Sequence, residues 1–162
     1  MARVYLGLGS NCRREDSLRS ALARLRSEFP DLRCSPVYES EAEDAVGGPY
    51  LNLAVALETR MPVAELKACL RGIEAALGRQ RGQPAVVIDI DILLYEGLCG
   101  FHAGMELPRP ELLRRAYVLK PLADLAGQER HPLTGLTFDE HWQGFMHPGR
   151  LQRVELPEAG HV

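Results

Sequence analysis

The run from Gly78 to Leu94 (GRQRGQPAVVIDIDILL) contains two carboxylates and two arginines whose types and spacing suit chemistry. Side chains alternate along a strand, so Asp89 and Asp91 share one face, with Cα atoms about 6.6 Å apart. Val87 and Leu93 share that face, and the other holds Ile88, Ile90, Ile92 and Leu94. Two such carboxylates can bind one divalent ion, or two ions bridged by phosphate, and hard oxygen ligands suit Mg²⁺. Alternatively, the pair is the solvent-facing side of an antiparallel strand.

Arginines near this strand favour the metal interpretation. Arg79 and Arg81 stand just upstream of it, and Arg109, Arg114 and Arg115 form a second basic cluster. A metal–triphosphate complex needs both carboxylates for the metal and guanidinium groups for the phosphates. The combination predicts phosphate chemistry.

The composition bounds the class of protein. The chain has 162 residues, 46% hydrophobic and 25% charged, so we expect residues 1–162 to form a single domain. A net charge of −3 and a pI near 6.0 argue against a general binder of nucleic acid or anionic membranes. The four cysteines have neither zinc-ligand spacing nor a disulfide pattern. Without an apolar run of about 18 residues or a signal peptide, we expect a cytoplasmic protein with reduced thiols.

Apolar periodicity predicts the elements that must position these residues. Strands are expected at 3–9, 33–38 and 50–59 and at the aspartates. One helix is expected to end at 29–30, and a second is expected to span 61–78. This order gives an α+β, ferredoxin-like βαββαβ fold, an antiparallel sheet with both helices on one face and the other face free for ligands. A short helical extension is expected within 106–126. The tail after His131 has no period, and His141 and His147 are expected on the surface.

Several polar features each allow two interpretations. Ser10 and Asn11 could contact phosphate, or only cap the following helix. The acidic, glycine-rich stretch 39–49 could close over a ligand or be a solvated connector. Tyr50 and Asn52 share a strand face with two alanines, where an amide could read the edge of a flat heterocycle, or both could be ordinary strand residues. Finally, Glu74 is either a solvated helix residue or a polar anchor.

Five motifs are specific when taken together: LGLGSN at 6–11, YLNLAVALET at 50–59, IEAALGRQR at 73–81, DIDILL at 89–94 and LPRPELLRRAYVLKPL at 107–122. With these motifs the chain resembles the 6-hydroxymethyl-7,8-dihydropterin pyrophosphokinase family of folate biosynthesis. The resemblance implies transfer of the β,γ-diphosphate of ATP to a pterin alcohol, leaving AMP.

The resemblance also implies roles for individual residues. Asp89 and Asp91 would bind two Mg²⁺ ions, and Glu74 would contact the nucleotide. The ATP phosphates would be faced by Arg79, Arg81 and Arg115. The pterin pocket would contain Ser40, Tyr50, Asn52 and Tyr117. The expected partners are the small molecules ATP and pterin, with no nucleic acid or membrane, and the protein is expected to be a monomer.

This chain departs from the family pattern around its phosphate-binding residues. The family usually has a longer mobile loop before the aspartates, with a Trp that covers the pterin and an Arg that acts on the phosphates. Here that loop is only GQPAVVI, with neither residue. Pro108-Arg109 stands where the family has Pro-His, and the proline usual after the Tyr-x-Ser step is missing. We expect Arg109 to be catalytic and to compensate for the altered loop.

Two hypotheses follow. The chain is an active pterin pyrophosphokinase, or it is a non-catalytic or altered-substrate paralogue that binds nucleotide or pterin. The retained aspartates favour the first, because adjacent like charges repel unless metal is present. The missing loop residues favour the second.

Overall fold

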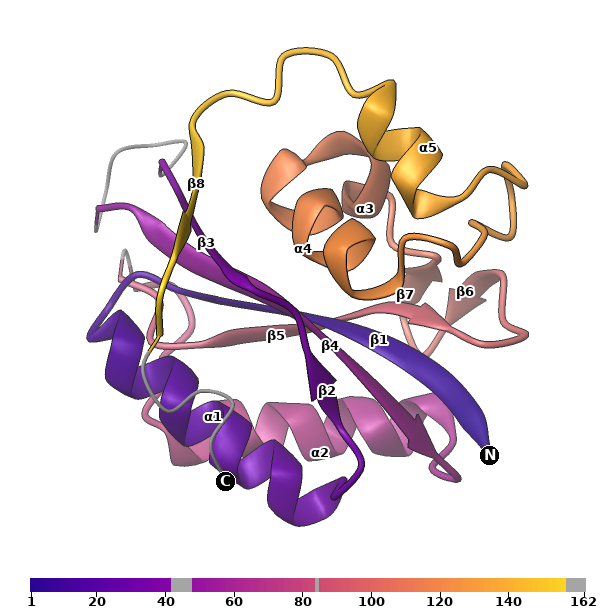
Figure 1. The fold of residues 1–162 in the computed structure, drawn as a ribbon. Helices are drawn as coiled ribbons and strands as arrows, with labels where there is room; N and C mark the ends of the chain where they lie inside the picture. The colour runs from indigo at the N-terminus through magenta and orange to yellow at the C-terminus, as the bar shows by residue number, and fades with distance from the viewer. Residues whose placement is uncertain (42–47, 84, 157–162) are drawn as a thin grey trace.

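A six-stranded antiparallel sheet forms the centre of the protein, in a computed structural model that describes residues 1–41, 48–83 and 85–156 (Figure 1). The strands run in the order β5-β1-β4-β3-β8, and β2 also pairs with β4. Their bounds are β1 Ala2–Ser10, β2 Arg33–Cys34, β3 Val37–Ser40, β4 Tyr50–Thr59, β5 Asp89–Tyr95 and β8 Leu151–Val154. A separate hairpin joins β6 Gly100–His102 to β7 Met105–Leu107. The helices are α1 Arg14–Glu28, α2 Val63–Ala76, α3 Glu111–Arg114, α4 Ala116–Ala126 and α5 Phe138–Gln143.

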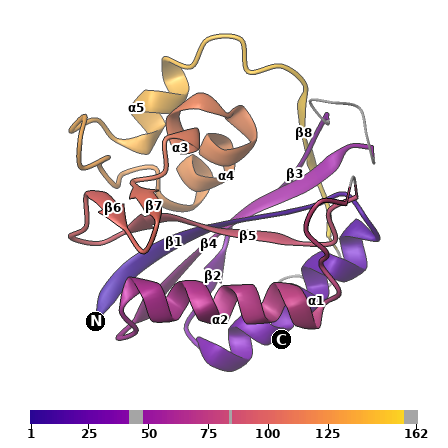
Figure 2. The same cartoon turned by 180° about the vertical axis from the view of Figure 1, so that it is seen from behind.

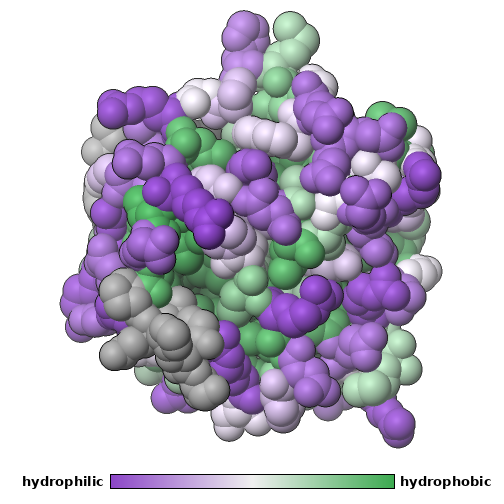
Figure 3. Space-filling model, viewed as in Figure 1, coloured by the Kyte–Doolittle hydropathy of each residue, from purple (hydrophilic) through white to green (hydrophobic). Residues whose placement is uncertain are grey.

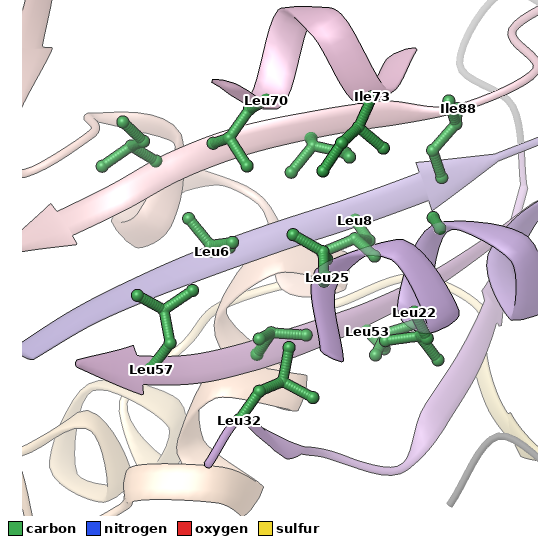
Figure 4. Packing of buried hydrophobic residues seen from close by; sticks show 14 of the residues in the cluster. Leu6, Leu8, Leu22, Leu25, Leu32, Leu53, Leu57, Leu70, Ile73 and Ile88 are labelled. Atoms are coloured by element: carbon green, nitrogen blue, oxygen red, sulfur yellow. The ribbon is translucent and has the colours of Figure 1, made fainter. Parts of the chain in front are cut away.

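Helices α1 and α2 cover one face of the sheet (Figures 1 and 2). Strand β1 sends Val4, Leu6 and Leu8 to this side, where they join a cluster with leucines from both helices (Figure 4). The period-2 pattern of the strands and the helical spacing of the leucines therefore meet on one side. The expected α+β, ferredoxin-like arrangement is confirmed.

The opposite face is only partly free, which corrects the expectation that it is open to ligands throughout. Helices α3, α4 and α5 pack there, as Figures 1 and 2 show. Ala54 and Ala56 of β4 belong to a second apolar cluster with Tyr5 and residues of α4, and Phe138 of α5 meets the Tyr5 ring edge-on at 6.4 Å. Helix α4 thus packs against the small alanine side chains, and only the rest of this face of the sheet is free.

A bulge in β5 changes the face of one residue. Leu6 pairs with Ile92 but Tyr5 pairs with Leu94, so Leu93 is an extra residue in the ladder. Leu94 consequently joins Leu93 and Tyr5 in the second cluster. The expectation that Leu94 shares a face with the isoleucines is wrong because strict alternation ends at this bulge.

The segment after residue 127 contains structure that the sequence pattern did not predict. A capping box starts α5, because the Thr137 hydroxyl accepts from the Glu140 N–H while the Glu140 carboxylate accepts from the Thr137 N–H. Strand β8 then pairs with β3 at the edge of the sheet. His141 is half-buried, with its ring bonded to the Thr134 hydroxyl at 2.7 Å, and His147 is exposed.

On the face drawn in Figure 3, hydrophobic surface is divided into separate areas by hydrophilic side chains. No helix among the described residues is long and apolar enough to cross a membrane. The four cysteines are free thiols: Cys12, Cys34, Cys69 and Cys99.

Candidate active site

A cavity of about 410 Å³ lies on the free part of the sheet face, bounded by α4. This volume falls within the range of small-molecule pockets. It brings together seven of the side chains singled out in the sequence: Ser40, Tyr50, Asn52, Arg79, Asp89, Asp91 and Tyr117.

The aspartate pair lies on the cavity face of β5. Asp91 stands opposite Gly7 of β1, and Asp89 stands opposite Gly9. Glycine has no Cβ, so neither partner fills the space beside a carboxylate, and the aspartate side chains are 29% and 34% exposed respectively. The strand alternation thus places both carboxylates side by side at the cavity, as predicted.

The two aspartates differ in acidity although they are neighbours. Burial disfavours ionisation of both, but hydrogen bonds with Asp91 and Arg79 and the charge of Arg79 lower the pKa of Asp89. Burial and the neighbouring Asp89 raise the pKa of Asp91 to about 7, against the opposing charge of Arg109. At neutral pH the Asp89 carboxylate is therefore ionised, and the Asp91 carboxylate is partly protonated. A cation between them would favour ionisation of both.

Each aspartate is paired with an arginine. Arg79 Nη1 lies 2.5 Å from Asp89 Oδ1, and Arg109 Nη2 lies 2.8 Å from Asp91 Oδ1. The backbone N–H of Arg109 also donates to the Leu93 carbonyl at 2.8 Å, which fixes this arginine against β5. In the protein without bound ligands, the two guanidinium groups thus offset the negative charge of the carboxylates.

Glu74 is a buried hydrogen-bond acceptor for several arginines near the aspartate pair. Its side chain is 2% exposed, so the solvated interpretation is wrong. It accepts from the Ile90 N–H at 2.7 Å and from the guanidinium groups of Arg71, Arg79 and Arg81 at 2.9–3.1 Å. Glu74 does not line the cavity, and its predicted contact with a nucleotide stays a prediction. Arg71 was missed, although its i,i+3 spacing to Glu74 on α2 was a usable signal.

The far end of the cavity combines aromatic and amide groups. Asn52 is 6% exposed and its Nδ2 donates to the Ser40 hydroxyl at 2.8 Å, so it is not an ordinary exposed strand residue. A Cβ on Gly9 would meet Asn52 Oδ1 at 3.0 Å, so the amide lies directly beside that glycine. Tyr50 from β4 and Tyr117 from α4 line the cavity from the sheet and from the helix. Such a site can hold a flat ring by its faces and its edge.

Other predicted site residues lie outside the cavity lining. The Arg81 side chain is 59% exposed, and Arg115 is exposed. Their phosphate contacts stay predictions. Most of the stretch expected to close over ligands falls on 42–47, outside the described residues. Its described ends are joined by Arg14, which contacts Glu39 Oε2 at 2.5 Å and the Pro49 carbonyl at 3.1 Å.

The glycine-serine-asparagine turn does not cap α1. The N-cap of α1 is Arg13, which makes no side-chain cap bond. The Asn11 side chain accepts from the Val86 N–H instead, at 2.6 Å. Ser10 donates to the Cys12 carbonyl at 3.3 Å. The capping expectation is therefore wrong, and Asn11 joins two segments distant in sequence.

The aspartate pair supplies few ligands by itself. Among residues 1–41, 48–83 and 85–156, no group of three or more His, Cys, Asp or Glu side chains could hold a metal ion. Mg²⁺ fits this donor set, because it binds through one or two carboxylates and completes its shell with water and substrate phosphates.

Comparison with known proteins indicates the same family that the sequence motifs resemble. The family model "7,8-dihydro-6-hydroxymethylpterin-pyrophosphokinase (HPPK)" matches residues 5–127. A Methylorubrum extorquens protein named 2-amino-4-hydroxy-6-hydroxymethyldihydropteridine pyrophosphokinase is 36% identical over 78% of this chain and 84% of its own. A Porphyromonas gingivalis protein of the same name is 37% identical over 78% of this chain and 92% of its own.

Longer proteins match over part of their length. The Pneumocystis carinii folic acid synthesis protein fol1 is 30% identical over 86% of this chain, which spans only 20% of fol1. A solved Plasmodium falciparum HPPK-DHPS structure has a TM-score of 0.67 and 14% identity, over 88% of this chain and 44% of its own. At that identity the structure supports the fold alone.

Proposed function

Because the chain belongs to the 7,8-dihydro-6-hydroxymethylpterin-pyrophosphokinase family, we propose that it transfers diphosphate from ATP to 6-hydroxymethyl-7,8-dihydropterin in folate biosynthesis. The observation that carries this proposal is a single cavity lined by the aspartate pair, Arg79 and the polar and aromatic residues expected at a pterin. AMP and the pterin diphosphate are the products.

Asp89 and Asp91 would hold Mg²⁺, two ions by family resemblance. The ions would neutralise charge on the phosphate oxygens and help to align them. The carboxylates have a second possible role, since the pterin hydroxyl must lose its proton as its oxygen bonds to the β-phosphorus. An aspartate at the cavity face can accept that proton.

Arg79 and Arg109 would bind the phosphates. In the protein alone they neutralise the two aspartates, at 2.5 Å and 2.8 Å. With the carboxylates engaged in holding Mg²⁺, the same guanidinium groups would be available to phosphate oxygens, which they would bind with charge-assisted hydrogen bonds. Arg81 and Arg115 would add to this positive field from more exposed positions. Glu74 would act by orienting Arg79 and Arg81.

The pterin would lie at the other end of the cavity. Tyr50 and Tyr117 would stack on its faces, and Asn52, held by Ser40, would bind its edge through an amide that both donates and accepts. We further propose that residues 1–162 act as one domain, since both apolar clusters pack on the same sheet, and that the protein is a monomer.

Incubation of the purified protein with Mg²⁺, ATP and 6-hydroxymethyl-7,8-dihydropterin, followed by nucleotide chromatography, tests the function. We expect AMP in equal amount to the pterin diphosphate, and no product when EDTA replaces Mg²⁺. ADP as the only nucleotide product would contradict attack at the β-phosphorus. Tight binding of both substrates without AMP would instead support the non-catalytic paralogue.

A further inference from the structure

The short connection between α2 and β5 is bonded to the turn that follows β1 (Figure 2). Asn11 makes two hydrogen bonds to one residue there: its N–H donates to the Val86 carbonyl at 3.0 Å, and its side-chain oxygen accepts from the Val86 N–H at 2.6 Å. Asn11 is only 8% exposed. A reciprocal pair of this kind fixes both polar groups of the Val86 backbone.

The residues after Val86 are held as well. Ile88 is fully buried in the core beneath the sheet, and its carbonyl accepts from Arg79 Nη1 at 3.2 Å. Asp89 then enters the ladder opposite Gly9. Val86, Ile88 and Asp89 are thus each held in place, and Val86 lines the cavity.

The strand register and the hydrogen bonds to Asn11 together place Val86 near the end of β4 that carries Tyr50. Gly9 lies opposite Asn52 on one side and opposite Asp89 on the other. Ser10 lies opposite Leu51, so the chain beyond it runs toward the Tyr50 end of β4. Val86, bonded to Asn11, stands at that end of the cavity.

We propose that Val86 is a fixed wall of the pterin site and that Asn11 is the positioning residue that holds it there. This inference rests on the proposed function. The branched aliphatic side chain covers the pterin ring from a backbone that is already in place, so binding needs no closing movement of residues 85–88. Anchoring of this kind lowers the ordering cost of binding.

Substrate kinetics provide the first test, with a matched pair of variants. Val86→Ala removes two methyl groups from the cavity wall, and we expect the KM for the pterin to rise about 3–10-fold with the KM for ATP within about twofold. Val87→Ala makes the same truncation at a half-buried residue that does not line the cavity, and should change neither constant. Equal pterin KM values in the two variants would overturn the proposal while leaving the proposed function intact.

Amide hydrogen exchange provides the second test and needs no activity. In the wild type without substrates, the Val86 amide should exchange at least about 100-fold more slowly than an open amide. Asn11→Ala should remove this protection, and Asn11→Asp, which keeps an acceptor oxygen, should restore it. Protection that appears only after pterin and ATP are added would show a closing segment and overturn the proposal. Failure of the wild type to form AMP, with the amide protected, would refute the proposed function alone.

Discussion

Arg109 is the arginine paired with Asp91, and its removal has a calculable consequence. In the protein alone, Arg109 contacts Asp91 at 2.8 Å, with side chains 23% and 29% exposed. If it moves to a phosphate in the transition state, Arg109→Ala loses a charge-assisted contact in a partly desolvated site. We expect kcat/KM to fall by roughly 10²–10³, about 3–4 kcal/mol of transition-state stabilisation.

Arg114→Ala is the matched control, because Arg114 lies in the same segment and is exposed. We expect it to lower kcat/KM by less than about tenfold. Both variants lose one positive charge, so the long-range field changes equally and the difference reports local contacts. Arg109→His keeps a hydrogen-bond donor that can carry a positive charge, and should recover part of the loss.

AMP formation under single-turnover conditions separates the chemical step from product release. Thermal melting of both variants shows whether the fold is kept. Equal losses for Arg109→Ala and Arg114→Ala would mean that only net charge matters in this segment. Unchanged rates in both would leave Arg109 as a counter-ion of Asp91 and refute the catalytic role.

Three further predictions concern other groups. Asp89→Ala or Asp91→Ala should abolish AMP formation while circular dichroism shows the fold retained, because either change removes a metal ligand and relieves repulsion; activity at the wild-type level would make the pair structural. Glu74→Gln should lower the free energy of unfolding in urea by about 1–3 kcal/mol, because a buried carboxylate serving three arginines becomes neutral, and should raise the KM for ATP; unchanged stability would contradict this. Burial and the nearby His141 lower the pKa of His131, so as the pH falls the unfolded chain takes up this proton before the folded chain does. The contribution of His131 to the free energy of unfolding is therefore complete above pH 6.5 and is lost as the pH falls through the folded-state pKa. His131→Asn should flatten this acid dependence in urea melts, and an unchanged slope would assign it to other groups.

The fold was predictable where one sequence period decided the outcome. In β1, alternation sends Val4, Leu6 and Leu8 toward the helices, because a shift of one residue would expose all three. Alternation failed at Leu94 because a bulge depends on pairing between strands, and the sequence of β5 alone does not encode its partner.

The C-terminal segment was harder for a different reason. Helix α5 has six residues and β8 has four, too few to show a period. Their stability comes from Phe138 in the second cluster and from pairing with β3. The Thr137–Glu140 capping box was nevertheless visible as Thr-x-x-Glu, and it could have predicted the helix start.

The site was predictable in its residues but less so in its connections. Period 2 alone placed Asp89 with Asp91, and Tyr50 with Asn52, on the cavity side. The bond from Asn11 to Val86 and the burial of Glu74 beneath three arginines join segments distant in the chain. No local pattern reports such contacts, because they depend on how the elements pack.

The structure also changes how the two functional hypotheses are separated. Arg79 and Arg109 offset part of the repulsion between Asp89 and Asp91, and the raised pKa of Asp91 relieves more of it, so the retention of both aspartates does not by itself require a metal. The proposed catalysis would require more, namely that the arginines leave the carboxylates for the phosphates when Mg²⁺ binds. Mg²⁺ and ATP must then strengthen each other's binding, and linkage makes this effect reciprocal. A paralogue that keeps its arginine–aspartate pairs closed needs no such coupling. Comparison of ATP affinity with and without Mg²⁺, in the wild type and in Asp91→Asn, therefore separates the hypotheses even before turnover is measured.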